Sequence, residues 1–241
     1  MRPILIEAAM ASELYYLVEK LNAKEKTINK VSFFETEFDA YPIVLMKTKV
    51  GEINSAISNT VAMMTYNPCL IINIGTGGGY GEEANVGDIV VGKSIRYISQ
   101  YVTSGDIEPD FNCWKKDKFV SLDGEEVSYS ISDKLLNYLK AELFKDKNVK
   151  YATICSGDIW SKDEETIRKH IELYDGLCEV MEATGAHFAA DSFNCPEFAL
   201  RIVSNNEIKG QLFEEHYGQD LQEFVYDLIP KLVCDAKKGL F

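Results

Sequence analysis

The stretch Cys69-Leu-Ile-Ile-Asn-Ile-Gly-Thr-Gly-Gly-Gly79 joins an apolar run of strand length to four glycines among five residues. The continuous apolar run is typical of a strand that is buried on both faces of a sheet. The glycines predict a turn after it, because glycine accepts positive φ and lets the backbone approach a ligand closely. In open α/β sheets ligands bind at such strand ends. The segment is therefore either a binding loop or a turn that only reverses the chain. Its spacing matches neither a dinucleotide fingerprint nor a phosphate loop.

Strand-like and helix-like segments alternate along the rest of the chain. Short apolar runs predict strands, and apolar residues with helical spacing predict helices. The expected strands span residues 3–9, 31–38, 42–48, 69–74, 87–91, 151–155, 176–180 and 197–203, with the second and third as an antiparallel pair. The expected helices span residues 12–21, 51–66, 132–144, 163–173, 182–192 and 217–234. This alternation is typical of the α/β class with a mostly parallel or mixed sheet.

Two segments carry more specific expectations. The helix over residues 51–66 is expected to bury one apolar stripe, formed by Ile53, Ile57, Val61 and Met64. Residues 103–128 are irregular and rich in charge, and are expected to be an excursion from the sheet. With 241 residues and no linker or repeat, the chain is expected to form one domain spanning residues 1–241.

The composition limits the classes of partner. The chain has 25 Lys and Arg against 38 Asp and Glu, a formal net charge of −13. Such an acidic surface disfavours nucleic acids and anionic membranes as partners. No apolar run approaches the roughly 20 residues of a membrane span, and Glu7 interrupts the short apolar N-terminus. The six cysteines and three histidines show no metal-ligand or redox spacing. We therefore expect a soluble cytoplasmic protein with reduced thiols, no metal and no cofactor.

Polar side chains suited to a small-molecule site lie at the ends of several expected strands. Strand ends that bring polar groups to one edge of a sheet are how α/β folds build such sites. These residues are Glu13, Thr76, Asp158, Glu182, Arg201 and Asn205.

Five segments together carry a family resemblance. They are Ala9-Met-Ala-Ser-Glu-Leu14, Asn73-Ile-Gly-Thr-Gly-Gly78, Val86-Gly-Asp-Ile-Val-Val91, Ser156-Gly-Asp158 with Val180-Met-Glu-Ala-Thr184, and Arg201-Ile-Val-Ser-Asn205. In this order they resemble the 5′-methylthioadenosine/S-adenosylhomocysteine nucleosidases of the nucleoside phosphorylase superfamily. The resemblance implies a three-layer α/β/α sandwich with a central mixed sheet and a homodimer. It also implies cleavage of the N-glycosidic bond of a purine nucleoside without metal or organic cofactor.

The resemblance also implies a role for each matching residue. Glu13 would orient and activate the attacking water, with Arg201 beside it. Glu182 would bind the ribose 2′- and 3′-hydroxyls, Met181 would pack on the sugar, and Trp160 would stack on the base. The other expected substrate contacts are Met10, Thr76, Gly77, Ser161, Val180 and Ser204. Each residue also has a purely structural interpretation. Glu13 and Glu182 could be acidic residues at helix N-termini, Arg201 a surface charge and Trp160 a residue of the hydrophobic core.

The nucleophile can be argued from Asn73. Phosphorylases resembling this chain have an arginine at this place and another in the loop near Glu13. A phosphate dianion needs cationic donors, so the sequence predicts water as the nucleophile.

Two departures from the nucleosidases bear on the substrate. Asn205 stands where they have the aspartate that protonates N7 of adenine, and an amide cannot act as a general acid at neutral pH. Its NH₂ and C=O can pair with O6 and a forming N7–H, which resembles the 6-oxopurine-preferring members, including trimeric purine nucleoside phosphorylases and futalosine hydrolases. Val180 replaces a glutamate near the ribose.

The sequence leaves several alternatives open. Besides the nucleosidase, they are a 6-oxopurine-preferring nucleosidase or phosphorylase and a nucleoside-binding or storage protein that has lost the acid. A shift of the alignment would bring Glu207 near the base, which is the less favoured reading. The 5′ substituent, with Phe213 and Tyr217 as candidate contacts, is also open. So is a contribution of residues 103–128 to a neighbouring subunit's site.

Overall fold

The computed structural model describes residues 1–99, 102–103, 109–110, 114–115, 118–120, 126–128 and 130–241, with side chains for 1–99 and 130–241. In this part of the chain nine strands form one mixed sheet in the order β13-β12-β6-β14-β5-β1-β4-β3-β2. Its central strand, β5, runs parallel to its neighbours β1 and β14, and its end also pairs antiparallel with β13. The strands are β1 (Ile4–Ala8), β2 (Lys24–Ile28), β3 (Val31–Phe38), β4 (Tyr41–Lys47), β5 (Leu70–Gly79), β6 (Ile89–Tyr97), β12 (Lys150–Ser156), β13 (Gly176–Val180) and β14 (Glu197–Asn205).

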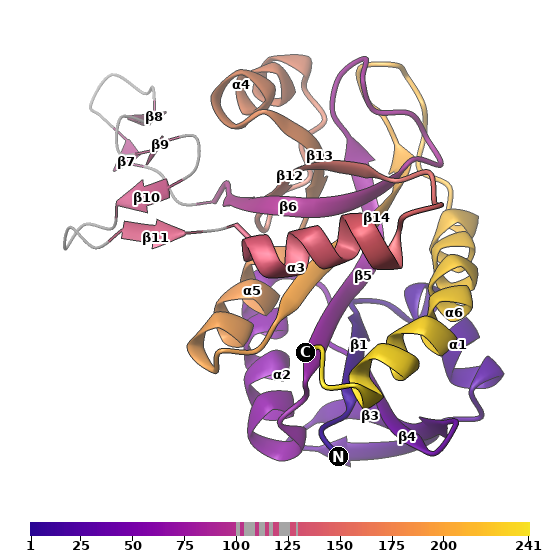
Figure 1. The fold of residues 1–241 in the computed structure, drawn as a ribbon. Coiled ribbons are helices and arrows are strands. Elements are labelled where there is room, and N and C mark those ends of the chain that lie inside the picture. The colour runs from indigo at the N-terminus through magenta and orange to yellow at the C-terminus, as the bar shows by residue number, and fades with distance from the viewer. Residues whose placement is uncertain (100–101, 104–108, 111–113, 116–117, 121–125, 129) are drawn as a thin grey trace.

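Helices cover both faces of this sheet (Figure 1). On one face α2 (Glu52–Tyr66) packs against α5 (Ala183–Ser192). On the other face one large apolar cluster joins the sheet to α1 (Tyr15–Lys20), α3 (Asp133–Tyr138), the π-helical turn η3 (Leu139–Leu143) and α6 (His216–Lys237). The helix α4 (Glu164–Tyr174) packs against β12 and β13. The expected three-layer α/β/α sandwich with a central mixed sheet is confirmed.

The segment between β6 and α3 stands apart from this sheet. Its described fragments pair as β7 (Val102–Thr103) with β8 (Pro109–Asp110), and as β10 (Lys118–Val120) between β9 (Trp114–Lys115) and β11 (Glu126–Ser128). Figure 1 shows these small sheets projecting beyond one end of β6. For these fragments the expected excursion is confirmed, whereas its contribution to a neighbouring subunit's site concerns side chains outside the described residues. None of the helices described for this chain is long and apolar enough to cross a membrane.

The glycine-rich segment does not turn where the sequence predicted. The strand β5 continues from Leu70 through Gly79, and positive φ first occurs at Gly81. The glycines serve close packing within the sheet. A Cβ on Gly77 would lie 3.2 Å from the carbonyl oxygen of Glu179, and one on Gly79 would lie 2.8 Å from a methyl group of Val203. The missing Cβ atoms let the neighbouring strands close around the end of β5.

The predicted inward face of α2 is wrong for three of its four residues, whereas Val61 is half-buried and packs against an apolar cluster of the core. Ile53, Ile57 and Met64 are 71%, 56% and 76% exposed, while the buried face consists of Glu52, Ser55, Ser58, Asn59, Ala62 and Met63. The reason is the short distance between α2 and α5. A Cβ on Gly185 of α5 would meet the backbone oxygen of Glu52 and lie 2.8 Å from the backbone nitrogen of Ala56. Only small or slender side chains fit at such a contact, so the apolar stripe faces outward.

Smaller differences concern element limits. The strands β6 and β14 extend to Tyr97 and Asn205, and the polar edge strand β2 was not predicted. The expected helix over residues 12–21 is divided into the 3-10 turn η1 (Ala11–Glu13) and α1. Glu13 is therefore the last residue of η1 and precedes α1, which begins at Tyr15.

Candidate active site

A cavity of about 320 Å³ opens where β5, β13 and β14 end. Its lining comes from η1, the glycine-rich end of β5, residues 159–161, the β13–α5 junction and the segment after β14. A cavity of this size suits a small ligand. Every residue to which the sequence analysis gave a catalytic role or an expected substrate contact lines this cavity except Arg201. Asp158 and the candidate contact Tyr217 do not line it either.

Glu13 is fixed at the floor of the cavity. Its Oε1 accepts hydrogen bonds from the backbone N–H of Thr76 at 2.8 Å and from the Thr76 hydroxyl at 2.9 Å. Its Oε2 accepts the backbone N–H of Met10 at 3.2 Å. A Cβ on Gly75 would lie 3.1 Å from the same carboxylate, so glycine there leaves room for it. Oε2 retains a free acceptor position, which could hold a water molecule in the cavity.

Glu182 lies at the junction between β13 and α5. Its Oε1 accepts the backbone N–H of Gly51 at 3.2 Å, and its Oε2 accepts that of Met181 at 3.3 Å. Burial raises the pKa of Glu182 to about 7, with a further increase from the charge of Glu13 and an opposing decrease from the positive charge of Arg201. The two carboxylates therefore share one cavity closely enough to influence each other's charge.

Arg201 lies beneath the cavity and does not line it. The side chain is 1% exposed, and its Nη1 donates to the carbonyl oxygens of Asn73 at 2.7 Å and Leu200 at 3.1 Å. Its Nη2 donates to the side-chain oxygen of Asn73. The Asn73 amide donates in turn to Glu7, whose pKa is raised to about 8 by burial. Arg201 therefore contributes no atoms to the lining, its expected place beside the attacking water stays a prediction, and its positive charge lowers the pKa of Glu182.

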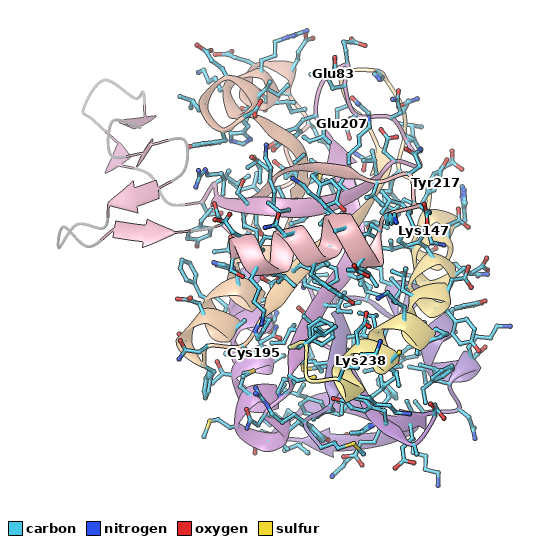
Figure 2. All side chains as sticks on the ribbon, in the orientation of Figure 1. Glu83, Lys147, Cys195, Glu207, Tyr217 and Lys238 are labelled. Atoms are coloured by element: carbon cyan, nitrogen blue, oxygen red, sulfur yellow. The ribbon has the colours of Figure 1, made fainter. Side chains whose placement is uncertain are left out.

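The strand end at Asn205 presents an amide to the cavity. Asn205 is 3% exposed, its side-chain oxygen accepts the Ser204 hydroxyl at 3.2 Å, and its NH₂ donates to Glu207 at 3.4 Å. Asn206 turns away and donates to the carbonyl oxygens of Gly81 and Ala84. Glu207 does line the cavity, and Figure 2 places it near the ends of β5 and β14. The sequence analysis offered Glu207 only as the less favoured alternative to Asn205, and the structure places both residues at the cavity.

Two aromatic side chains flank the mouth of the cavity. Trp160 and Phe213 are 52% and 42% exposed, and their rings form an edge-to-face pair with centroids 6.2 Å apart. The plain-core interpretation of Trp160 is therefore wrong. Phe213 was a candidate contact for the 5′ substituent and does line the cavity, whereas Tyr217, the other candidate, is not part of the lining.

Sequence reasoning missed Glu179 and Tyr80, which also line the cavity. Glu179 is 6% exposed, and its charge interrupts the apolar run of β13. A charged residue inside a short buried strand was the signal available. Asp158, in contrast, accepts the backbone N–H of Glu52 at 2.9 Å and so holds the start of α2.

The comparisons with known proteins concern the family and the fold. A model of the Phosphorylase superfamily matches residues 3–229. The chain is 28% identical over 219 residues to a 5′-methylthioadenosine/S-adenosylhomocysteine nucleosidase of Bacillus subtilis, covering 89% of this chain and 90% of that protein. The structure of the corresponding Campylobacter jejuni nucleosidase superposes with a TM-score of 0.79 at 22% identity, covering 96% of this chain and 100% of that one. The futalosine hydrolase of Helicobacter pylori superposes with a TM-score of 0.78 at 17% identity, covering 95% and 98%.

Proposed function

Because the chain belongs to the Phosphorylase superfamily, we propose that it is a purine nucleoside N-ribosyl hydrolase similar to the 5′-methylthioadenosine/S-adenosylhomocysteine nucleosidases. It releases the free purine base by cleaving the N-glycosidic bond. One observation carries this proposal: Glu13 and Glu182 open onto the same cavity, beside the Thr76 end of β5. Cleavage of a glycoside needs one group that handles the nucleophile and another that supports the cationic sugar.

In this proposal Glu13 handles the nucleophile. Thr76 and Met10 fix both oxygens of its carboxylate, and one acceptor position of Oε2 stays available for a water molecule. A positioned carboxylate of this kind can accept the proton that the water loses as it attacks the anomeric carbon.

Glu182 binds the ribose. Its ionised form can accept hydrogen bonds from the 2′- and 3′-hydroxyls, and these bonds strengthen as the ring becomes cationic. Met181, the adjacent lining residue, packs on the sugar.

The charges around the cavity favour water over phosphate. Its described lining includes four glutamates, Glu13, Glu179, Glu182 and Glu207, and no Lys, Arg or His. The one arginine predicted for the site, Arg201, does not line the cavity, and its Nη1 and Nη2 donate to Asn73 and Leu200. A phosphate dianion would meet repulsion here without the cationic donors that it needs.

The base lies in the remaining part of the cavity. Trp160 supplies an aromatic surface at its mouth, and the Asn205 amide presents a donor and an acceptor to the base edge. Ser204 and Asn205 hold the edge of the departing base. N7 gains one proton through water exchanging with solvent, and Glu13 returns to solvent the proton that it took from the attacking water, so that the protons balance over the turnover.

We also propose a homodimer that covers the outward face of α2. Ile53, Ile57 and Met64 on this face, together with Val50 just before the helix, are all more than 40% exposed. A contiguous apolar patch of this kind marks an interaction surface.

A product assay tests the proposed function. The protein is incubated with inosine, guanosine, adenosine and 5′-methylthioadenosine, each with and without phosphate. We expect free base and free ribose from at least one of them, at a rate that does not depend on phosphate. Ribose 1-phosphate as the product, with no turnover in phosphate-free buffer, would show a phosphorylase instead.

Glu13→Gln is the matching variant. It should lower kcat by roughly two to four orders of magnitude, the range for losing a general base, while substrate binding persists. Glu197→Gln is the control, because Glu197 is a buried glutamate of β14 that does not line the cavity. Binding of a nucleoside without any cleavage by the wild-type protein would favour the binding or storage reading.

A further inference from the structure

Glu179 is a buried carboxylate at the cavity that the proposed hydrolysis does not use. It lies in β13, directly opposite Gly78 of β5, and Gly78 is in turn opposite Asn205 of β14. Residues opposite each other on neighbouring strands present their side chains to the same face of a sheet. Glu179 and Asn205 therefore stand on either side of a glycine, and all three line the cavity.

The spacing of this arrangement suits a flat heterocycle. Neighbouring strands lie roughly 4.8 Å apart, so two strand steps separate the backbones of Glu179 and Asn205 by about 10 Å. Gly78 has no side chain to occupy the space between them, and a Cβ there would lie in ordinary contact with the Asn205 amide, 3.5 Å from its nitrogen. A purine lying over Gly78 meets an amide at one edge and a carboxylate at the other.

The partners of Glu179 commit it to accepting hydrogen bonds. Its Oε1 accepts the backbone N–H of Ser161 at 2.6 Å, and its Oε2 accepts the Ser161 hydroxyl at 2.6 Å and the Tyr80 hydroxyl. The Tyr80 oxygen also lies 2.8 Å from Nδ1 of His170, which donates to it because the tyrosine proton is already used. Oε1 has one remaining acceptor position, and an ionised carboxylate cannot donate.

We infer that Glu179 accepts the N1–H of a 6-oxopurine whose O6 and N7 edge faces Asn205, so that hypoxanthine and guanine nucleosides are the preferred substrates. This inference rests on the proposed function and specifies its base. In a 6-oxopurine N1 carries a proton, whereas in adenine N1 is an acceptor and would face the carboxylate lone pairs. A site whose buried polar group is left unpaired by an analogue rejects that analogue by large factors.

Binding of the free bases tests the inference without requiring turnover. Titration calorimetry of the wild-type protein should show hypoxanthine binding more tightly than 1-methylhypoxanthine and adenine, because both lack the N1–H donor. The difference expected for one hydrogen bond to a charged group is about 10- to 100-fold. In kinetic assays kcat/KM should follow the same order for inosine, 1-methylinosine and adenosine.

Glu179→Gln assigns the effect to this residue. The variant amide can donate to N1 of adenine, so the ratio of kcat/KM for inosine to that for adenosine should fall by about tenfold or more. Glu197→Gln, which removes a buried carboxylate outside the cavity, should leave the ratio unchanged. If Glu179 only anchors Ser161 and Tyr80, Glu179→Gln would lower both activities alike and the ratio would stay constant.

The outcomes separate the two proposals. Equal binding of hypoxanthine and 1-methylhypoxanthine, or tighter binding of adenine, overturns the inference even if nucleosides are hydrolysed. Selective binding of hypoxanthine without any hydrolysis leaves the inference standing and removes the proposed function. Binding of none of these bases removes the inference as well.

Discussion

At the scale of single residues, the carboxylates that line the site differ in their hydrogen-bond partners. Glu13 is held by Thr76 and Met10, Glu179 by Ser161 and Tyr80, and Glu182 only by two long backbone hydrogen bonds. The weakly held Glu182 is the one whose pKa is raised to about 7, with burial as the largest cause. Small changes in pH around 7 therefore alter the charge of Glu182.

A pH profile of kcat/KM should report this equilibrium. Only the ionised Glu182 can accept both ribose hydroxyls, so activity should rise with pH as the carboxyl loses its proton near pH 7, and should fall on the acid side. Glu182→Gln should remove this limb along with most of the activity. Glu7→Gln is the control, because burial also raises the pKa of Glu7, to about 8, and Glu7 does not line the cavity. A limb that persists in Glu182→Gln and disappears in Glu7→Gln would contradict the assignment.

At the scale of elements, the close contact of α2 with α5 decides how the site is supported. Glu182 and Glu52 lie at the starts of α5 and α2, and the carboxylate of Glu52 accepts the backbone N–H of Gly185 at 2.6 Å and the Ser156 hydroxyl. The Gly51 N–H that binds Glu182 comes from the same helix start. The two helices thus fix one carboxylate of the cavity through their mutual packing.

Gly185→Ala should disturb this contact. The new Cβ would meet backbone atoms of Glu52 and Ala56, which cannot move aside as a flexible side chain can. We expect a loss of about 1–3 kcal/mol in the free energy of unfolding, the usual cost of overpacking, measured by urea denaturation. Asp191→Ala, at an exposed position of the same helix, should change it by less than about 0.5 kcal/mol. Equal stability of the two variants would show that α2 and α5 can separate without cost.

At the scale of the whole molecule, an acidic chain with a net charge of −13 leaves one helix face apolar. The patch formed by Val50, Ile53, Ile57 and Met64 lies next to Gly51, whose N–H binds Glu182. Val50 itself lines the cavity. A homodimer formed through this patch would therefore have its interface next to the cavity.

Ile53→Glu should weaken the proposed homodimer. A charge placed within the patch would be buried without a partner on association, which is strongly unfavourable. Sedimentation equilibrium should show a dimer for the wild type and a shift toward monomer for the variant. Leu212→Glu is the matched control, since Leu212 is 79% exposed outside this patch. A wild-type monomer, or a dimer unchanged by Ile53→Glu, would mean that another surface is used.

The sequence by itself determined the class of fold and indicated many of the residues that line the cavity. Apolar runs and helical spacing are local properties, and they located the strands and helices that form the mixed sheet. The motifs around Glu13, Thr76, Glu182 and Asn205 also indicated a common cavity. These residues follow strands, and strand ends of an α/β sheet meet at one edge.

Only the tertiary structure decided which atoms face one another. Pairing of β13 and β14 with the same glycine of β5 placed Glu179 opposite Asn205. Because α2 and α5 pack closely, most of the apolar side chains expected to face inward on α2 face solvent. Arg201 is buried and donates hydrogen bonds to Asn73 instead of lining the cavity. These contacts join residues far apart in the chain, and their geometry depends on every element between them. A local sequence pattern indicates which secondary structure a segment favours, but it does not specify the segment against which that structure packs.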